Sequence, residues 1–309
     1  MDSGLNKRKL RRERASAGHQ LGSAVGDWFE RYFVLPVLGQ VAQELDLFLD
    51  NRFIQRPARG AKILWQDEDR NIVDYDFVLE LQGSLTGIGI PVGFVESFWR
   101  RGARHSKDKA RDDSGKLRPM RVTYPTARFL GIVAGGDFTS PARELVLNQQ
   151  IDLFYVPKIK LIESFKDHNL IMDYADNANE SVKQRVASDF EQAFTEEIKL
   201  AVADSLINNV GVGAIKAYVD RIRVKLSSPP QEIRFILRQD SQPVIFDSVG
   251  EATDFLASPR FIQVDMIESY VYQITYSDGT EFERSIDSFE ELCKLHGQMV
   301  TLANHMDKF

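Results

Sequence analysis

The sequence predicts an α/β protein, in which helices flank a mixed β-sheet and are followed by a helical region and a small α+β unit. Three observations predict this class. Between residues 27 and 157, apolar segments of strand length alternate with helix-forming segments. Residues 161–226 have the apolar spacing of amphipathic helices. The segment SSPPQ at 227–231 is typical of a linker, and strands with an Asp-Gly turn follow it.

Composition places the chain among ordinary globular proteins. It has 309 residues, of which 43% are hydrophobic and 27% are charged, so it can form more than one domain. No apolar run reaches the roughly 18 to 20 residues that span a membrane. The N-terminal segment lacks the apolar core of a signal peptide, so we expect a cytoplasmic protein without membrane contact. A single cysteine, Cys293, excludes an internal disulfide framework and a Cys-rich zinc site.

The predicted domain organisation has four parts. Residues 1–20 form a basic N-terminal arm, and residues 21–160 form an α/β core. Residues 161–226 form the helical region, and residues 232–309 form the small α+β domain.

The first half of the core is predicted as one long helix followed by three strands. Residues 27–53 have helical apolar spacing, bent or broken near Pro36. Residues 61–66 form a short strand. Residues 72–81 alternate and then become apolar, as a half-buried strand does, and residues 92–99 form the next strand after a Gly-rich connection. These strands are close in sequence, which favours antiparallel pairing.

The second half of the core alternates between helices and strands. The basic segment after Trp99 is predicted to be helical until about Asp113, where DDSGK breaks the helix. Residues 127–136 form a buried strand, Ser140 is the N-cap of the next helix with Pro141 in its first turn, and residues 151–157 form a further strand. Strands that alternate with helices are predicted to be parallel.

The C-terminal third combines helices with a hairpin. Residues 180–207 give the clearest amphipathic helix. Strands are predicted within residues 233–239, 243–248 and 261–276, the last running to a turn at 277–280. A capping box near Asp287 or Ser288 begins the final helix.

Charge is unevenly distributed along a chain whose net charge is −6. Residues 1–14 carry six Lys or Arg against two acidic residues, and residues 97–128 carry ten against three. The remainder is therefore strongly acidic. This separation predicts that a polyanion docks on the basic regions.

Two carboxylates are predicted to meet across the hairpin of residues 73–98. If its turn centres near Thr86, Asp76 faces Glu96, and a slip of two residues places Asp74 there instead. Like charges opposed across a strand pair repel. A divalent cation between them removes the penalty, and Mg²⁺ binds through one or two carboxylates, waters and substrate phosphates.

This order of elements and acids resembles the restriction-endonuclease-like PD-(D/E)xK nuclease superfamily over residues 27–157. The resemblance implies that Asp76, with Asp74 as the alternate, and Glu96 hold Mg²⁺ or Mn²⁺. The sequence departs from the motif at two positions. Tyr75 stands where the family has Pro, and Phe98 stands where it has the Lys that activates water. The resemblance implies that a cation from the following helix, either Lys107 or Lys109, takes the place of this Lys.

The basic segment is the predicted nucleic-acid contact. Four cations spaced 4, 3 and 4 apart would form one stripe on a helix, and with Arg101 they are the candidate phosphate ligands: Arg100, Arg104, Lys107 and Arg111. Phosphate contacts position nucleic acid without choosing its sequence. The alternative is a solvated face neutralised by the acids at 108, 112 and 113.

These observations predict a metal-dependent endodeoxyribonuclease, with DNA as the partner, catalytic residues Asp76, Glu96, Lys107 and Lys109, and Mg²⁺ or Mn²⁺ as the cofactor. A restriction or phage-defence role, as a homodimer or as a subunit of a defence complex, follows from family analogy alone. The alternative is a non-catalytic DNA-binding or scaffold protein on a degenerate nuclease fold, which the missing Lys at position 98 favours. A carboxylate-based sugar or nucleotide hydrolase is a third reading, which leaves the cations unexplained.

Overall fold

The computed structural model describes residues 16–237, 243–258 and 269–309. Most of the predicted basic arm and residues 261–268 of the predicted hairpin lie outside these ranges. The chain divides into two compact units, each built from three stretches. The first unit contains described residues up to Gln40, with Val95–Gly115 and Gly131–Val219. The second contains the described residues of Val41–Phe94, Lys116–Leu130 and Asp220–Phe309.

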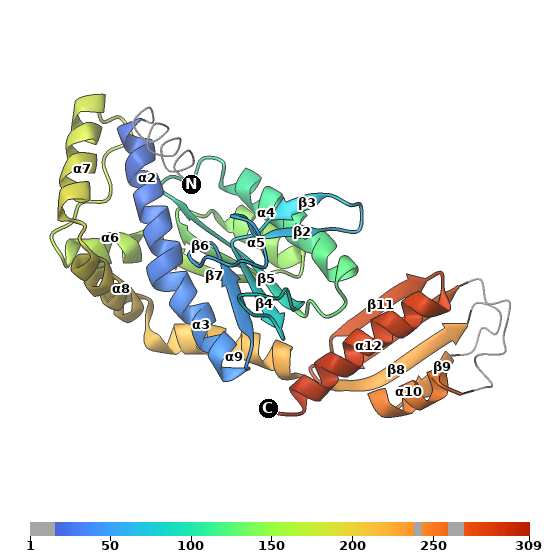
Figure 1. Cartoon of the computed structure of the whole chain (residues 1–309). Coiled ribbons are helices and arrows are strands. Elements are labelled where there is room, and N and C mark those ends of the chain that lie inside the picture. Colours follow the sequence, from blue (N-terminus) through green and yellow to red (C-terminus); the bar gives the residue numbers. More distant parts are fainter. Residues whose placement is uncertain (1–15, 238–242, 259–268) are drawn as a thin grey trace. The chain divides into compact units, whose positions relative to one another are not determined.

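The main sheet has five strands in the order β1-β4-β5-β6-β7, of which β4 to β7 are labelled in Figure 1. Their bounds are Phe48–Asn51, Phe77–Leu81, Ile90–Arg100, Phe129–Gly136 and Asp152–Pro157. Strands β1 and β4 are antiparallel, and β6 and β7 are parallel. The prediction of a mixed sheet flanked by helices is therefore confirmed.

The predicted helix over 27–53 is wrong at its C-terminal end. Helix α2 (Ala17–Trp28) continues through a π-helical segment (Phe29–Val34) into α3 (Leu35–Glu44), so the shift in hydrogen bonding falls just before Pro36. The chain then turns at Asp46, whose φ is 48°, and enters β1. The apolar residues 47–49 continue the helical spacing, but pairing with β4 determines their conformation.

The predicted strand over 72–81 is also wrong, because it is two strands in different sheets. Strand β3 (Ile72–Asp74) pairs with β2 (Leu64–Gln66) in a separate two-stranded sheet, and β4 begins at Phe77. Tyr75, between them, is buried and donates its hydroxyl to the Lys116 carbonyl oxygen at 2.7 Å. This anchor turns the chain out of one sheet before it enters the other.

Helix α4 runs from Ser106 to Thr123, through the residues predicted to break it at Asp113. A buried face explains its length, because Ala110, Leu117 and Met120 recur at helical spacing and are fully buried. Tertiary burial outweighs the low helix propensity of Gly and the cost of Pro119. Helices α5 (Ser140–Asn148) and α6 (Lys158–Lys166) follow β6 and β7, respectively.

The helical region contains α7 (Glu180–Ala193), α8 (Glu196–Val210) and α9 (Val212–Ser227). The single helix predicted over 180–207 is broken where the Thr195 side chain caps α8 by accepting from the Ile198 N–H. Within the described residues, no single helix is long and apolar enough to cross a bilayer; only the bent pair α8–α9 meets that test jointly.

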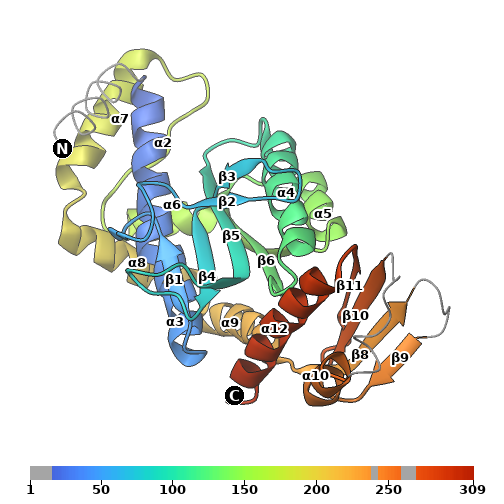
Figure 2. The same cartoon turned by 45° about the vertical axis from the view of Figure 1, so that its right-hand side comes forward.

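The C-terminal part of the second unit is a four-stranded sheet covered by two helices, as Figure 2 shows. The strands have the order β11-β10-β8-β9, with bounds Glu281–Ile286, Tyr270–Tyr276, Pro230–Leu237 and Pro243–Phe246. Helix α10 (Val249–Leu256) was not predicted. Helix α12 (Phe289–Met306) begins as expected, because the Ser288 hydroxyl accepts from the Glu291 N–H at 3.1 Å.

Candidate functional site

The C-terminal ends of three strands meet at one edge in the first unit. The Asp137 N–H, directly after β6, donates to the carbonyl oxygen of Arg100, the last residue of β5, at 2.9 Å. In the parallel pair, Gly136 of β6 lies opposite Pro157, the last residue of β7. We call this the strand-end edge and define it as Glu96–Arg100 of β5, the following Arg101, Asp137 and Lys158, with Asp173, which contacts both Arg101 and Lys158. Ligands bind at such carboxyl edges in open α/β sheets.

Gly136 is required for this close approach. Its φ is 100°, a region that residues with a Cβ rarely adopt. A Cβ there would also collide with the Arg100 carbonyl oxygen and the Trp99 ring. The glycine at the end of β6 therefore lets the two strand ends lie side by side.

Two helices begin at the same edge. The Ser106 hydroxyl, at the start of α4, is 3.0 Å from the Thr139 hydroxyl, the N-cap residue of α5. His105 has a φ of 66° and turns the chain from the β5 end into α4. Helix N-termini carry unsatisfied N–H groups and partial positive charge, so both helix starts make this edge attractive to anions.

Glu96 lies within β5 and is 1% exposed. Side chains two apart on a strand share a face, so Phe98 and Arg100 follow Glu96 on one side of β5. Burying a carboxylate is costly unless it is paired, protonated or bound to a metal. A hard cation binds through one or two carboxylates, so Glu96 is a suitable oxygen ligand.

Helix α4 brings a cation to Phe98, the position where the nuclease motif has its Lys. The Nζ atom of Lys109 lies 5.4 Å from the Phe98 ring centroid and 2.6 Å from Oδ1 of the fully buried Asp113. Phe98 itself is held edge-on by Phe138, with ring centroids 5.2 Å apart. Lys107, the other predicted substitute, is exposed in the first turn of α4. Of the two lysines, the structure therefore brings Lys109 to β5.

The predicted single helical stripe of cations is wrong. Arg100 ends β5 and Arg104 lies in the turn before α4, because hydrogen bonding to Asp137 extends the strand to Arg100. Arg100, Arg104 and Lys107 are exposed and make no ion pair within the described residues. Arg111 pairs with Asp108 at 3.6 Å.

Arg101 belongs to an ion-pair network that sequence reasoning missed. Its guanidinium contacts Asp173 at 3.1 Å and Asp176 at 2.9 Å, and Lys158 contacts Asp173 at 2.9 Å and Asp137 at 3.5 Å. Burial raises the pKa of Asp173, but hydrogen bonds from Lys158 and Arg101 outweigh burial and lower it below its usual value. The signal in the sequence was that Arg101, Asp137 and Lys158 each directly follow a strand end.

The other predicted carboxylates belong to the second unit. Asp74 accepts a hydrogen bond from the Ile63 N–H at 3.1 Å and pairs with Lys62 at 2.9 Å, so it closes the β2–β3 ribbon. Asp76 is half-buried directly before β4. Its pairing with Glu96 stays a prediction. Among the described residues, no three His, Cys, Asp or Glu side chains form a metal-binding group.

A buried ion cluster in the second unit also went unpredicted. The Arg56 guanidinium contacts Glu80 at 2.5 and 2.7 Å and Asp50 at 2.7 Å, and Arg59 contacts Asp50 at 2.7 Å. Two cations thus neutralise two buried carboxylates from β1 and β4. Because these groups satisfy one another, we interpret the cluster as structural.

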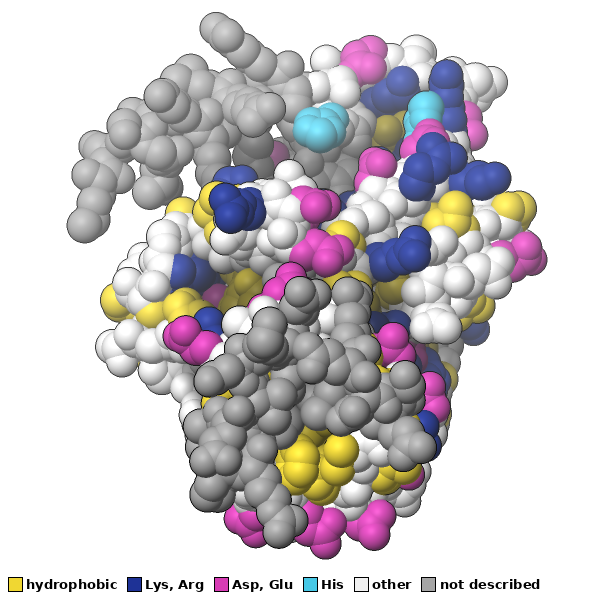
Figure 3. Space-filling view, turned by 90° about the vertical axis from the view of Figure 1, so that its right-hand side faces the viewer, with side chains coloured by type: hydrophobic (Ala, Val, Ile, Leu, Met, Phe, Trp, Pro, Cys, Tyr) yellow, Lys and Arg dark blue, Asp and Glu magenta, His cyan; other side chains and the backbone are white. Residues whose placement is uncertain are grey.

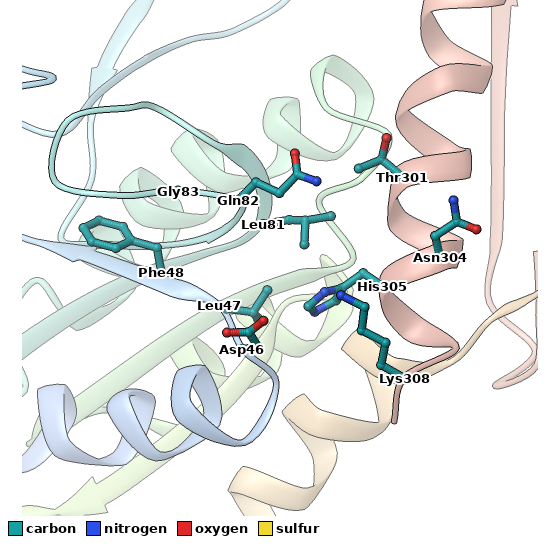
Figure 4. A pocket seen from close by; sticks show the side chains of 10 residues that line it. All are labelled: Asp46, Leu47, Phe48, Leu81, Gln82, Gly83, Thr301, Asn304, His305 and Lys308. Atoms are coloured by element: carbon teal, nitrogen blue, oxygen red, sulfur yellow. The ribbon is translucent and has the colours of Figure 1, made fainter.

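Figure 4 shows a cavity of about 470 Å³ in the second unit, lined by residues near β1 and β4 and by the end of α12. His305 lies in its wall with Nε2 2.7 Å from the Leu45 carbonyl oxygen, and burial lowers its pKa. Gln82 and Asn304 contribute amides, and Lys308 contributes an ammonium group. This lining suits hydrogen bonding, whereas the strand-end edge offers the concentration of cations that phosphates require.

Figure 3 shows a face of the molecule on which Lys and Arg side chains gather in the upper part, with Asp, Glu and His side chains between them.

No protein-family model, curated protein or solved structure matches this chain.

Proposed function

We propose that the chain is a metal-dependent endonuclease with a restriction-endonuclease-like core, which hydrolyses DNA phosphodiester bonds at the strand-end edge. The order of elements supports the proposal. Helices α2 and α3 precede the main-sheet strands β1, β4 and β5, and then α4 and β6 follow, with the β2–β3 ribbon as an excursion between β1 and β4. This order resembles the αβββαβ core of that superfamily.

The contact between Lys109 and Phe98 carries the proposal. The nuclease motif needs a cation two residues after its acid, and Phe98 occupies that position after the buried Glu96. The Lys109 ammonium group, supplied from α4, lies over the Phe98 ring and is held by Asp113. This contact supports the proposal that Lys109 supplies the charge that the motif position lacks.

Each residue has a distinct role in this reaction. Glu96 would hold the divalent cation, and Asp76 is its partner by prediction from the sequence. When bound, Mg²⁺ or Mn²⁺ polarises a phosphate and lowers the pKa of a bound water. Lys109 would neutralise negative charge that develops on the phosphate, an effect that reaches several kcal/mol in a preorganised site. Arg100, Arg104 and Lys107 would bind neighbouring phosphates.

One observation favours a second function, DNA binding without cleavage. The Lys109 ammonium group already forms an ion pair with Asp113 at 2.6 Å, and Asp113 is fully buried. If Lys109 serves only to neutralise Asp113, it does not assist a reaction at Glu96. The exposed Arg and Lys side chains would then bind DNA without cleaving it.

Cleavage of plasmid and single-stranded DNA in Mg²⁺ or Mn²⁺ tests the proposal, comparing wild type with Glu96→Gln. We expect the wild type to cleave and the variant to lose activity by about a hundredfold or more. Glu191→Gln is the matched control, because Glu191 is exposed on α7 of the same unit. Cleavage that survives Glu96→Gln would defeat the site assignment. DNA binding without cleavage by wild type would favour the second function.

A further inference from the structure

One carboxylate of the strand-end edge is shared by two cations. Asp173 places Oδ1 3.1 Å from Nη1 of Arg101 and Oδ2 2.9 Å from Nζ of Lys158. The second guanidinium nitrogen of Arg101 contacts Asp176 at 2.9 Å. Arg101 and Lys158 therefore hold the two oxygens of one anion, which is how cations hold the non-bridging oxygens of a phosphate.

The two cations occupy the same edge as the proposed reaction. Arg101 directly follows β5, which carries Glu96, and Lys158 directly follows β7. The neighbouring Arg100 and Arg104 make no ion pair within the described part of the chain. A nucleic-acid backbone that contacts these open cations would bring its next phosphates close to Arg101.

The competing acids are carried by a segment without helix or strand, residues 170–179. Leu170 and Met172 are buried and anchor the start of this segment. The Asp176 side chain is 92% exposed, and the Asp173 side chain is 25% exposed. The exposed Asp176 pair is worth little, and a phosphate would offer Arg101 and Lys158 the same oxygen contacts that Asp173 gives them, while the buried anchors stay in place.

We propose that Arg101 and Lys158 form a second phosphate subsite, which Asp173 and Asp176 occupy until nucleic acid displaces them. This inference rests on DNA as the ligand of the proposed function, but not on cleavage. The internal acids lower the affinity of the edge for isolated anions. A backbone that gains contacts at several cations together overcomes this competition.

DNA affinity tests the inference. Fluorescence anisotropy with a labelled DNA duplex in EDTA measures binding by the full chain while metal-dependent cleavage is suppressed. We expect the Asp173→Asn/Asp176→Asn double variant to bind roughly three to ten times more tightly than wild type at low salt, because two of the three carboxylates that contact Arg101 and Lys158 no longer compete with phosphate. Its salt dependence becomes steeper by about one released counterion for each newly available phosphate contact.

Three further variants make the result specific. Asp167→Asn removes an exposed charge at the end of α6 in the same unit that makes no ion pair with Arg101, so it should bind as wild type does. Adding Lys158→Ala to the double variant should cancel most of its gain. Asp176→Asn alone changes an exposed side chain and provides a variant that folds normally, with an intermediate gain.

Unchanged affinity in both Asp176→Asn and the double variant would overturn the inference and assign the two acids to holding their segment in place. An equal gain in Asp167→Asn would also overturn it, because general charge would then explain the effect. Tighter binding without cleavage by any variant would support the subsite while rejecting the endonuclease, so the two proposals fail separately.

Discussion

The Nζ atom of Lys109 lies 5.4 Å from the centre of the Phe98 ring, so a cation of α4 covers the side chain two residues after Glu96. Phe98 is 6% exposed and packs against Phe138, which fixes the surface that Lys109 contacts. Asp113, one helical turn later on α4, holds the ammonium group at 2.6 Å. Lys107, by contrast, is exposed in the first turn of α4.

Lys109→Ala should reduce the DNA cleavage rate by about a hundredfold, because it removes a preorganised charge over Phe98, two residues after Glu96. Lys107→Ala is the matched control on the same helix, and its exposed side chain should affect DNA affinity more than the rate of cleavage. Single-turnover cleavage with saturating protein separates the two quantities. Equal rates for both variants would exclude a special role for Lys109.

Moving the charge back to the strand gives a complementary test. Phe98→Lys combined with Lys109→Ala should recover part of the lost cleavage, because the cation then occupies the motif position. The loss of the Phe98–Phe138 contact should lower the thermal stability of the double variant. A double variant that is folded by circular dichroism but completely inactive would contradict the proposal that Lys109 supplies the charge of the motif lysine.

Sequence periodicity predicted the mixed sheet but misplaced its first strand. Residues 47–49 continue the apolar spacing of α3, and only the pairing of Phe48 with Glu80 reveals a strand. Likewise, nothing local shows that the chain changes sheets at Tyr75, because its anchor is the distant Lys116 carbonyl oxygen. Local patterns predict elements well, and long-range pairing determines where these elements end.

The elements that carry the candidate residues were predicted only in part, because they too depend on long-range contacts. The placement of Glu96 in a strand followed from its apolar surroundings in the sequence, and the preference for Lys109 over Lys107 needed the contact of Lys109 with Phe98. Asp173 lies more than seventy residues from Arg101 in sequence, so no spacing rule connects them. The sequence therefore cannot show that Asp173 forms an ion pair with Arg101, a residue predicted to bind phosphate.

Arg56→Ala should destabilise the protein by about 3–5 kcal/mol, because it leaves the buried carboxylates of Asp50 and Glu80 uncompensated. Urea denaturation monitored by circular dichroism measures this change. Arg52→Ala is the control, because Arg52 is exposed and a surface substitution should change stability by less than about 0.5 kcal/mol. A loss below about 1 kcal/mol for Arg56→Ala would show that the cluster is dispensable.

Acid should destabilise the protein through His296, which is 3% exposed. Burial lowers its pKa to about 4. Its ring nitrogens lie 2.9 Å from the hydroxyl oxygens of Tyr272 and Thr253, so the neutral ring is well accommodated. The unfolded state binds the proton first, with a pKa near 6.5, so stability falls as the pH decreases from about 6.5 to about 4.

The loss from this residue should approach roughly 3 kcal/mol at the lower end of that range, at 1.36 kcal/mol for each pKa unit. His296→Gln should show a smaller decline in the free energy of unfolding between pH 7 and pH 4.5. Urea titrations of both proteins at each pH measure the difference. Parallel stability curves would mean that His296 is not the group responsible.

The most direct test of the central claim is anomalous diffraction from crystals soaked in Mn²⁺. The proposed endonuclease predicts an anomalous peak in contact with the Glu96 carboxylate at the strand-end edge, and predicts that Glu96→Gln crystals lose it. Anomalous peaks at other acids with none at Glu96, in crystals that contain Mn²⁺, would contradict the account.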